Sequence, residues 1–204
     1  LLGGMLAVFQ MVWVYGVWLV PASYGALVVR STMIFSLTMS YFLFAEERRH
    51  IRSGGFLACA LLGLLAVVGI CVLDDDFELR GHLVAGTAIF LASSLLWSVY
   101  EVAVRKLAGR TSPLPTFAVT VLVTTALLSI PAAVEGRLEV MWDRQVSDWK
   151  VQAAVVSSGA LCIGATNALY YQSLRRIGLA YSNMIDLAAP FLTGLFAWLV
   201  LGDA

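Results

Sequence analysis

Seven long apolar runs constrain the fold of this chain more than any other feature of its sequence. A helix rises 1.5 Å per residue, so about 20 apolar residues cross the roughly 30 Å hydrocarbon core of a bilayer. The composition agrees, because 60% of the 204 residues are hydrophobic and 13% are charged. We therefore predict an all-α integral membrane protein with seven transmembrane helices, at residues 3–20, 25–45, 54–73, 83–104, 115–134, 151–172 and 179–201.

The charges between these runs alternate in sign. The loops after the second, fourth and sixth runs hold eight of the 13 Lys and Arg residues, whereas the loops after the third and fifth runs are acidic. Cytoplasmic loops carry the positive excess in membrane proteins. We therefore expect the observed start of the chain inside the cell and its observed end outside.

Several classes of function find no support in the sequence. The net charge of zero leaves no basic excess for nucleic-acid binding. His50 and His82 lie in loops on opposite sides of the membrane, and the three cysteines lack metal-ligand spacing. The acidic run at 74–78 has no second acidic motif to complete a magnesium and diphosphate site. Because a glycine-rich phosphate loop and a nucleophile elbow are also missing, we expect no catalytic residue, metal or cofactor, and no enzyme.

The sequence also contains an internal repeat. Residues 13–46 align with residues 170–203 at a shift of 157 without a gap, and the alignment pairs Tyr24 with Tyr181 and Glu46 with Asp203. The second run points inward and the seventh points outward, so the repeat is inverted, as it often is in transporters. Completing the repeat predicts ten helices in two five-helix units, with two helices before the first run and one after the last.

This repeat defines the expected domains. Residues 1–73 hold the last three helices of the first repeat, residues 74–82 form an acidic outside linker, and residues 83–204 hold the first four helices of the second repeat.

Several motifs within the runs resemble the drug/metabolite transporter superfamily, specifically its EamA-type members. The matching segments are ASYGA at 22–26, FLFAEER at 42–48, LWSVY at 96–100, IGLAYS at 177–182 and LVLGD at 199–203. The chain departs from the family pattern at Thr32 and Met33, where the family has a proline, and at Asp203, where it usually has Glu. The resemblance implies a ten-helix transporter with a central substrate cavity. The plasma (inner) membrane is the simplest expectation, and the resemblance leaves an organellar membrane open because the superfamily includes organellar exchangers.

Three charges lie inside the apolar runs, where each costs at least about 2.5 kcal/mol on insertion scales. They are Arg30, Glu101 and Asp186. In the internal repeat Arg30 aligns within one residue of the partner of Asp186, so we predict that the two face each other near the midplane. They form either a substrate site, in which Asp186 takes an amine or a proton, or a structural ion pair. Glu101 precedes Arg105 by four residues and is either half of a helical ion pair or a proton carrier.

Other polar and small residues complete the candidate set. Pro190 removes the helical donor of the Asp186 carbonyl, which indicates either a gating kink beside the cavity or a plain packing kink. Asn183 shares a helix face with Asp186, and Trp97 shares one with Glu101. The remaining candidates are Asn167, Tyr170 and Tyr171, as cavity-lining or helix–helix groups, and Gly55, Cys59 and Gly63, as a packing or homodimer face.

Two functions remain open from the sequence. The first is a secondary transporter that moves small metabolites or drug-like solutes by alternating access, with the lipid bilayer and a solute as partners. The second is a non-transporting intramembrane protein, either an enzyme of lipid metabolism or a scaffold. The inverted repeat with paired intramembrane charges favours the transporter.

Overall fold

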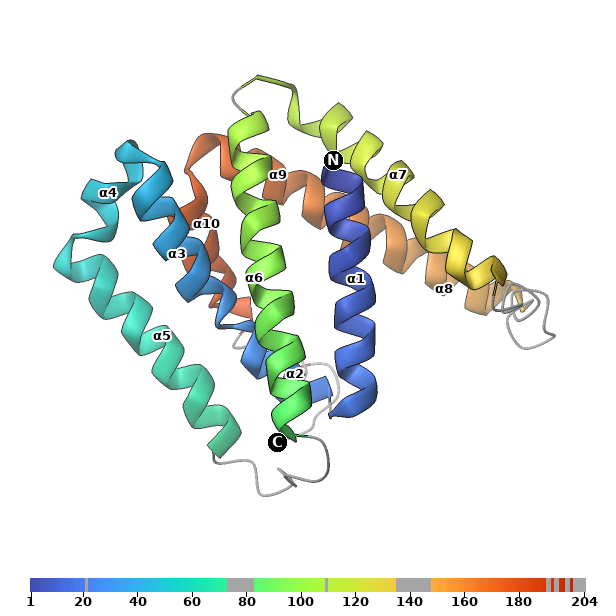
Figure 1. The fold of residues 1–204 in the computed structure, drawn as a ribbon, viewed down its shortest axis with the longest axis horizontal. Helices are drawn as coiled ribbons and strands as arrows, with labels where there is room; N and C mark the ends of the chain where they lie inside the picture. Colours follow the sequence, from blue (N-terminus) through green and yellow to red (C-terminus); the bar gives the residue numbers. More distant parts are fainter. Residues whose placement is uncertain are drawn as a thin grey trace. The chain divides into compact units, whose positions relative to one another are not determined.

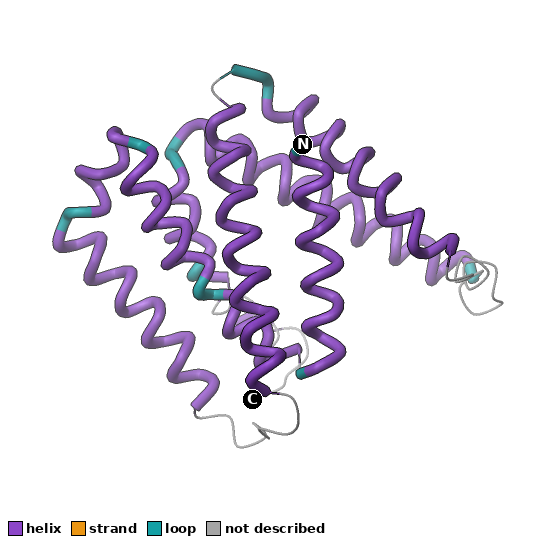
Figure 2. The backbone as a smooth tube through the Cα atoms, in the orientation of Figure 1, coloured by secondary structure: helices purple, strands orange, loops and turns teal. Residues whose placement is uncertain are grey.

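In the computed structural model the described residues of the chain fold mainly into helices (Figures 1 and 2). The structure describes residues 1–20, 22–72, 83–108, 110–134 and 148–189, together with positions 192, 195, 196 and 199. Its elements are α1 (Leu2–Leu19), α2 (Ala22–Val29), α3 (Thr32–Leu43), α4 (Ala45–Ile51), α5 (Gly54–Val72), α6 (Leu83–Ala108), α7 (Pro113–Val134), α8 (Trp149–Ser158), the π-helix η2 (Gly159–Ala165), α9 (Thr166–Arg176) and α10 (Leu179–Asp186).

Four helical segments in this part of the chain are long and apolar enough to cross a membrane. They are Leu2–Leu19, Val84–Leu107, Pro113–Val134 and Trp149–Arg176. Thr32–Leu43 and Gly54–Gly63 are shorter apolar helices. These spans confirm an all-helical, multi-pass membrane protein, and the count of seven stays a prediction. The run predicted at 25–45 divides into α2 and α3, so neither half reaches the length of a span.

The contacts of the chain divide it into two compact units. One unit consists of residues 1–8 and 103–176, and the other of residues 9–102 and 177–204. The division predicted from the internal repeat, at residues 74–82, stays a prediction.

In the first unit, α7 packs along α9. The rings of Phe117 and Tyr171 meet edge to face with centroids 5.4 Å apart, and Tyr171 is buried. The Thr124 hydroxyl donates a 3.1 Å hydrogen bond to the Gly3 carbonyl. Close backbone approach explains Gly3, because a Cβ there would lie 2.6 Å from Val123. Small residues at such contacts are typical of membrane helices.

In the second unit, α3 packs on α10 and α4, and serines of α6 contact α2 and α3. Leu187 and Met33 are buried together with Ala60, which lies on α5. Tyr24 and Thr87 join α2 to α6 through a 2.6 Å hydrogen bond between their hydroxyls. Buried serines at positions 36, 40, 94 and 98 form hydrogen bonds between these helices. Small hydroxyl side chains let the helices approach closely while satisfying polar groups inside the bilayer.

The helix predicted at 25–45 is interrupted at Arg30 and Ser31, which form a turn between α2 and α3. Ser94 on α6 donates to the carbonyl of Val29 at 3.5 Å, and Ser98 donates to that of Thr32 at 3.1 Å. Irregular backbone at membrane depth is tolerated where the protein satisfies it in this way.

A second interruption follows α10, where Leu187 and Ala188 form a turn. The 157-residue shift of the internal repeat carries both ends of α2 onto both ends of α10, and the end of α1 onto the end of α9. The bounds of these helices thus agree with the alignment, and the inverted repeat itself stays a prediction.

Glu47 on α4 fixes the start of α10. Its carboxylate accepts hydrogen bonds from the backbone N–H groups of Leu179 (2.9 Å) and Ala180 (2.8 Å), and from the Ser40 hydroxyl (2.5 Å). The preceding Gly178 adopts φ 86° and ψ 176°, and a Cβ there would lie 2.5 Å from Glu47 Oε1. An anionic side chain at a helix N-terminus satisfies donors that the helix itself leaves open.

Candidate solute-binding site

A cavity of about 300 Å³ lies within the second unit. Its wall is built from α1, the turn between α2 and α3, α6 and the end of α10. The lining residues are Phe9, Gln10, Trp13, Val29, Arg30, Thr32, Met33, Trp97, Glu101, Asn183, Asp186 and Leu187. Pockets of this size that combine apolar walls with a few convergent polar groups are typical of small-molecule sites.

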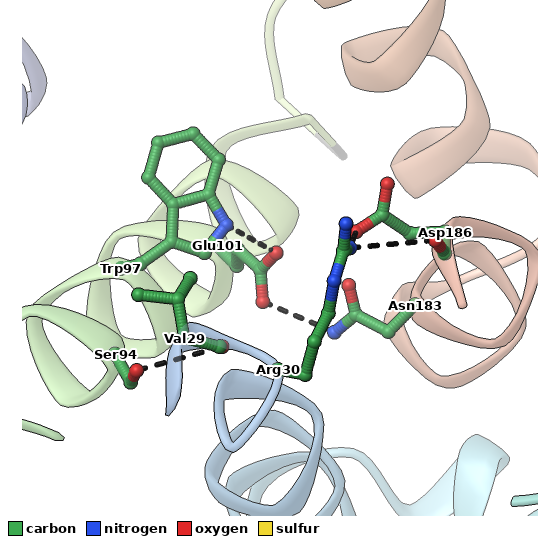
Figure 3. Close-up of polar contacts among 7 residues, drawn as sticks. All are labelled: Val29, Arg30, Ser94, Trp97, Glu101, Asn183 and Asp186. Carbon is green, nitrogen blue, oxygen red and sulfur yellow. Dashed lines mark hydrogen bonds and ion pairs between the residues drawn. The ribbon is translucent and has the colours of Figure 1, made fainter. Parts of the chain in front are cut away.

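Arg30 and Asp186 form an ion pair at the edge of this cavity. The Arg30 Nη1 atom lies 3.0 Å from Asp186 Oδ2 and 3.5 Å from the Asp186 carbonyl oxygen (Figure 3). The Arg30 side chain is 26% exposed and that of Asp186 is 64% exposed. Each residue lies beside one of the two helix interruptions. The structure thus brings together the two charges that the internal repeat pairs, and their role in binding stays a prediction.

Glu101 lies deeper in the wall, with 1% of its surface exposed. Its carboxylate accepts hydrogen bonds from Trp97 Nε1 at 2.7 Å and from Asn183 Nδ2 at 3.1 Å (Figure 3). It also accepts a hydrogen bond from the Ser36 hydroxyl. These donors come from α6, α10 and α3, so the carboxylate joins three helices. The structure therefore buries the Glu101 carboxylate among three helices, and the choice between an ion-pair role and a proton-carrying role stays a prediction. Ser36 was missed because a serine in an apolar run gives no sequence signal of its own.

Aromatic rings form the apolar wall of the cavity. The ring centroids of Phe9 and Trp97 are 4.7 Å apart, and those of Phe9 and Trp13 are 6.2 Å apart. Trp97 is predicted from the sequence as a lining residue, whereas Phe9 and Trp13 of α1 are not. Aromatic residues are common in membrane helices, so their type alone does not distinguish a cavity wall from a surface that faces lipid.

Asn167, Tyr170 and Tyr171 lie on α9, in the first unit, and are not among the described residues that line this cavity. Asn167 Nδ2 donates to the Ile163 carbonyl at 2.9 Å, within its own helical segment. Tyr171 packs on Phe117. Their role in lining a cavity stays a prediction.

The remaining candidates from the sequence do not line this cavity in the described part of the chain. Pro190, Asp203, His82 and the acidic run at 74–78 lie outside the described residues. At Gly63 a Cβ would lie 2.7 Å from Leu187 Cδ1, which supports the packing interpretation for that residue. The homodimer face stays a prediction. In the part of the chain that the structure describes, no three His, Cys, Asp or Glu residues gather where they could hold a metal ion.

Comparisons with known proteins agree with this architecture. The model of the EamA-like transporter family matches residues 84–204. A search of curated proteins gives no match. A solved crystal structure, described only as that of a protein, matches with a TM-score of 0.79 and 23% sequence identity. The match covers all of this chain and 67% of the other, and at this identity it shows the fold alone.

Proposed function

The chain belongs to the EamA-like transporter family, and we propose on that premise that it moves small solutes across a membrane by alternating access around the cavity beside Arg30 and Asp186. The observation that carries the proposal is the position of this ion pair. Each partner lies at the interruption of a helix, and both line one cavity. Interrupted helices whose ends point at the ligand are a recurring feature of transporter binding sites.

The bounds of the helices support the proposed pair of inverted repeats. Because α2 and α10 begin and end at equivalent positions, the two interruptions are equivalent as well. In our proposal the full protein has ten helices in two five-helix units, and this chain contains seven of them. The alternating charge of the loops supports opposite orientations for the two copies.

We assign Arg30 to a carbonyl or anionic group of the solute, and Asp186 to an amine or a proton. Arg30 Nη1 points at Asp186, and the Arg30 Nε and Nη2 groups have no partner among the described residues. A guanidinium has five N–H donors in a fixed fork, so it can hold a carboxylate and a solute oxygen together. An isolated structural ion pair would not require the adjoining cavity.

Glu101 is the second candidate for coupling transport to protons. Its carboxylate faces Ser36 on α3, Trp97 on α6 and Asn183 on α10, and the same cavity wall carries Arg30 and Asp186. Protonation would remove the negative charge that strengthens hydrogen bonds from three helices. In proteoliposomes, Glu101→Gln is expected to keep solute exchange and to lose accumulation driven by a pH gradient. Gradient-driven accumulation that survives in Glu101→Gln would exclude this role.

Solute-induced thermal stabilisation tests the proposed site. The purified protein is screened against a metabolite panel as wild type, Arg30→Ala, Asp186→Ala and Arg49→Ala, the last an exposed arginine outside the cavity. We expect a solute that stabilises the wild type and Arg49→Ala but neither cavity variant, and that is transported in proteoliposomes. A solute that stabilises all four proteins equally would place the site elsewhere. Tight binding without transport would contradict the transporter itself.

A further inference from the structure

We propose that the Thr32 hydroxyl is a solute-binding group that pairs with a carbonyl oxygen of the transported compound. The proposal rests on the proposed function and adds to it a residue and a chemical class. Thr32 is 8% exposed and lines the cavity, and its hydroxyl has no hydrogen-bond partner among the described residues. A buried hydroxyl without a partner destabilises a protein, so its presence needs a physical reason.

The position of Thr32 supplies that reason. It is the first residue of α3, directly after the Arg30–Ser31 turn, and its own carbonyl accepts a hydrogen bond from Ser98. The backbone at this point is therefore fixed while the side-chain hydroxyl is unsatisfied. The hydroxyl is covered in this conformation, so pairing with a solute requires a rearrangement at the turn. The helix is already interrupted there, and alternating access requires such rearrangements.

The surrounding cavity indicates the kind of solute. Arg30, two residues earlier, has N–H groups without a partner among the described residues, so Arg30 and Thr32 place two kinds of hydrogen-bond donor on the same cavity wall. The described wall carries two carboxylates, Glu101 and Asp186, against one guanidinium. That balance disfavours an additional anion and favours a neutral carbonyl, such as an amide or a ketone. The rings of Phe9, Trp13 and Trp97 suit an apolar or aromatic body on the same compound.

Ser93 provides a matched control. Ser93 is also buried, at 0% exposure, and its hydroxyl has no partner in the part of the chain that the structure describes, but Ser93 is not among the residues that line the cavity. Removing either hydroxyl removes an unsatisfied polar group, so Thr32→Val and Ser93→Ala should both raise the melting temperature of the protein without solute. Only Thr32→Val should weaken solute binding.

The experiment measures the affinity of phenylacetamide, a neutral carbonyl probe with an aromatic body, for the wild type and both variants. Phenylacetate, which has the same shape and a negative charge, tests the preference for a neutral acceptor. We expect phenylacetamide to bind the wild type more tightly than phenylacetate. Thr32→Val should lose about five- to tenfold in affinity for phenylacetamide, as for one lost hydrogen bond, while Ser93→Ala keeps it.

Three results would overturn the assignment of Thr32. The first is that the wild type does not bind phenylacetamide, and the second is that Thr32→Val leaves the affinity for phenylacetamide unchanged. The third is that the wild type binds phenylacetate more tightly than phenylacetamide. If any of these is found while panel solutes still depend on Arg30 and Asp186, the proposed function stands and the Thr32 assignment fails. If panel solutes bind independently of Arg30 and Asp186, the proposed site itself fails.

Discussion

The carboxylate of Glu47 accepts a 2.9 Å hydrogen bond from the backbone N–H of Leu179, a residue 132 positions later in the chain. A second oxygen of the same carboxylate accepts from Ala180 at 2.8 Å. One side chain of α4 therefore holds the beginning of α10, the helix that ends at Asp186 and carries Asn183 into the cavity wall. Changes at Glu47 should affect the stability of the protein first and the cavity second.

Replacing Glu47 by Ala should destabilise the protein strongly. The change leaves two buried backbone N–H groups without their acceptor, at roughly 1 to 3 kcal/mol for each group. The melting temperature in detergent measures the effect, and Glu46→Ala, at the exposed neighbouring position, is the control. Glu47→Gln should be intermediate, because its amide keeps one acceptor oxygen. Equal melting temperatures for Glu46→Ala and Glu47→Ala would show that the contact contributes nothing.

Replacing Gly178 by Ala should also lower the melting temperature. Its φ of 86° and ψ of 176° are available almost only to glycine, and forcing another residue there costs about 1 to 3 kcal/mol. The added Cβ would also displace the Glu47 carboxylate. Gly54→Ala is the control, because nothing lies within 4 Å of a Cβ at Gly54. Unchanged stability of Gly178→Ala would contradict the conformation found at this loop.

Close packing at Gly25 gives a third prediction. A Cβ there would overlap the ring of Phe90, which is completely buried. Overpacking of this kind typically costs about 1 to 3 kcal/mol, so Gly25→Ala should lower the melting temperature. Gly4→Ala has open space and should be neutral or slightly stabilising, because Ala is the better helix former. A combined Gly25→Ala/Phe90→Leu variant should recover part of the loss; no recovery would assign the loss to another contact.

The contribution of the Arg30–Asp186 ion pair to protein stability can be measured separately from its contribution to solute binding. Arg30→Gln and Asp186→Asn each leave one charge without its partner in the membrane, whereas the double variant removes both charges. We expect the double variant to be more stable than the sum of the single effects predicts, and still to lack solute-induced stabilisation. Melting temperatures of the four proteins, with and without solute, measure both quantities. Solute binding retained by the double variant would assign the pair a structural role only.

The sequence by itself determined the helical membrane architecture of this protein. Apolar runs of span length dictate helices, because a bilayer offers no other partner for backbone N–H and C=O groups. The repeat at a shift of 157 residues aligned Arg30 with the neighbourhood of Asp186, and the two form an ion pair in the structure. These features are local or periodic, so they can be found in a single sequence.

Apart from the pair of Arg30 and Asp186, the tertiary structure alone decided which buried polar residues meet. Glu101 is joined to Ser36 and Asn183 because α3, α6 and α10 converge, and no spacing along one helix encodes that contact. The hydrogen bonds of Glu47 likewise depend on which helices pack together. The same is true of the Thr32 hydroxyl, which has no hydrogen-bond partner among the described residues. The physical reason is that helices in lipid are hydrophobic on every face, so the hydrophobic pattern does not identify the face that packs on a neighbour. Small residues and hydrogen bonds between segments far apart in sequence determine which helices pack together.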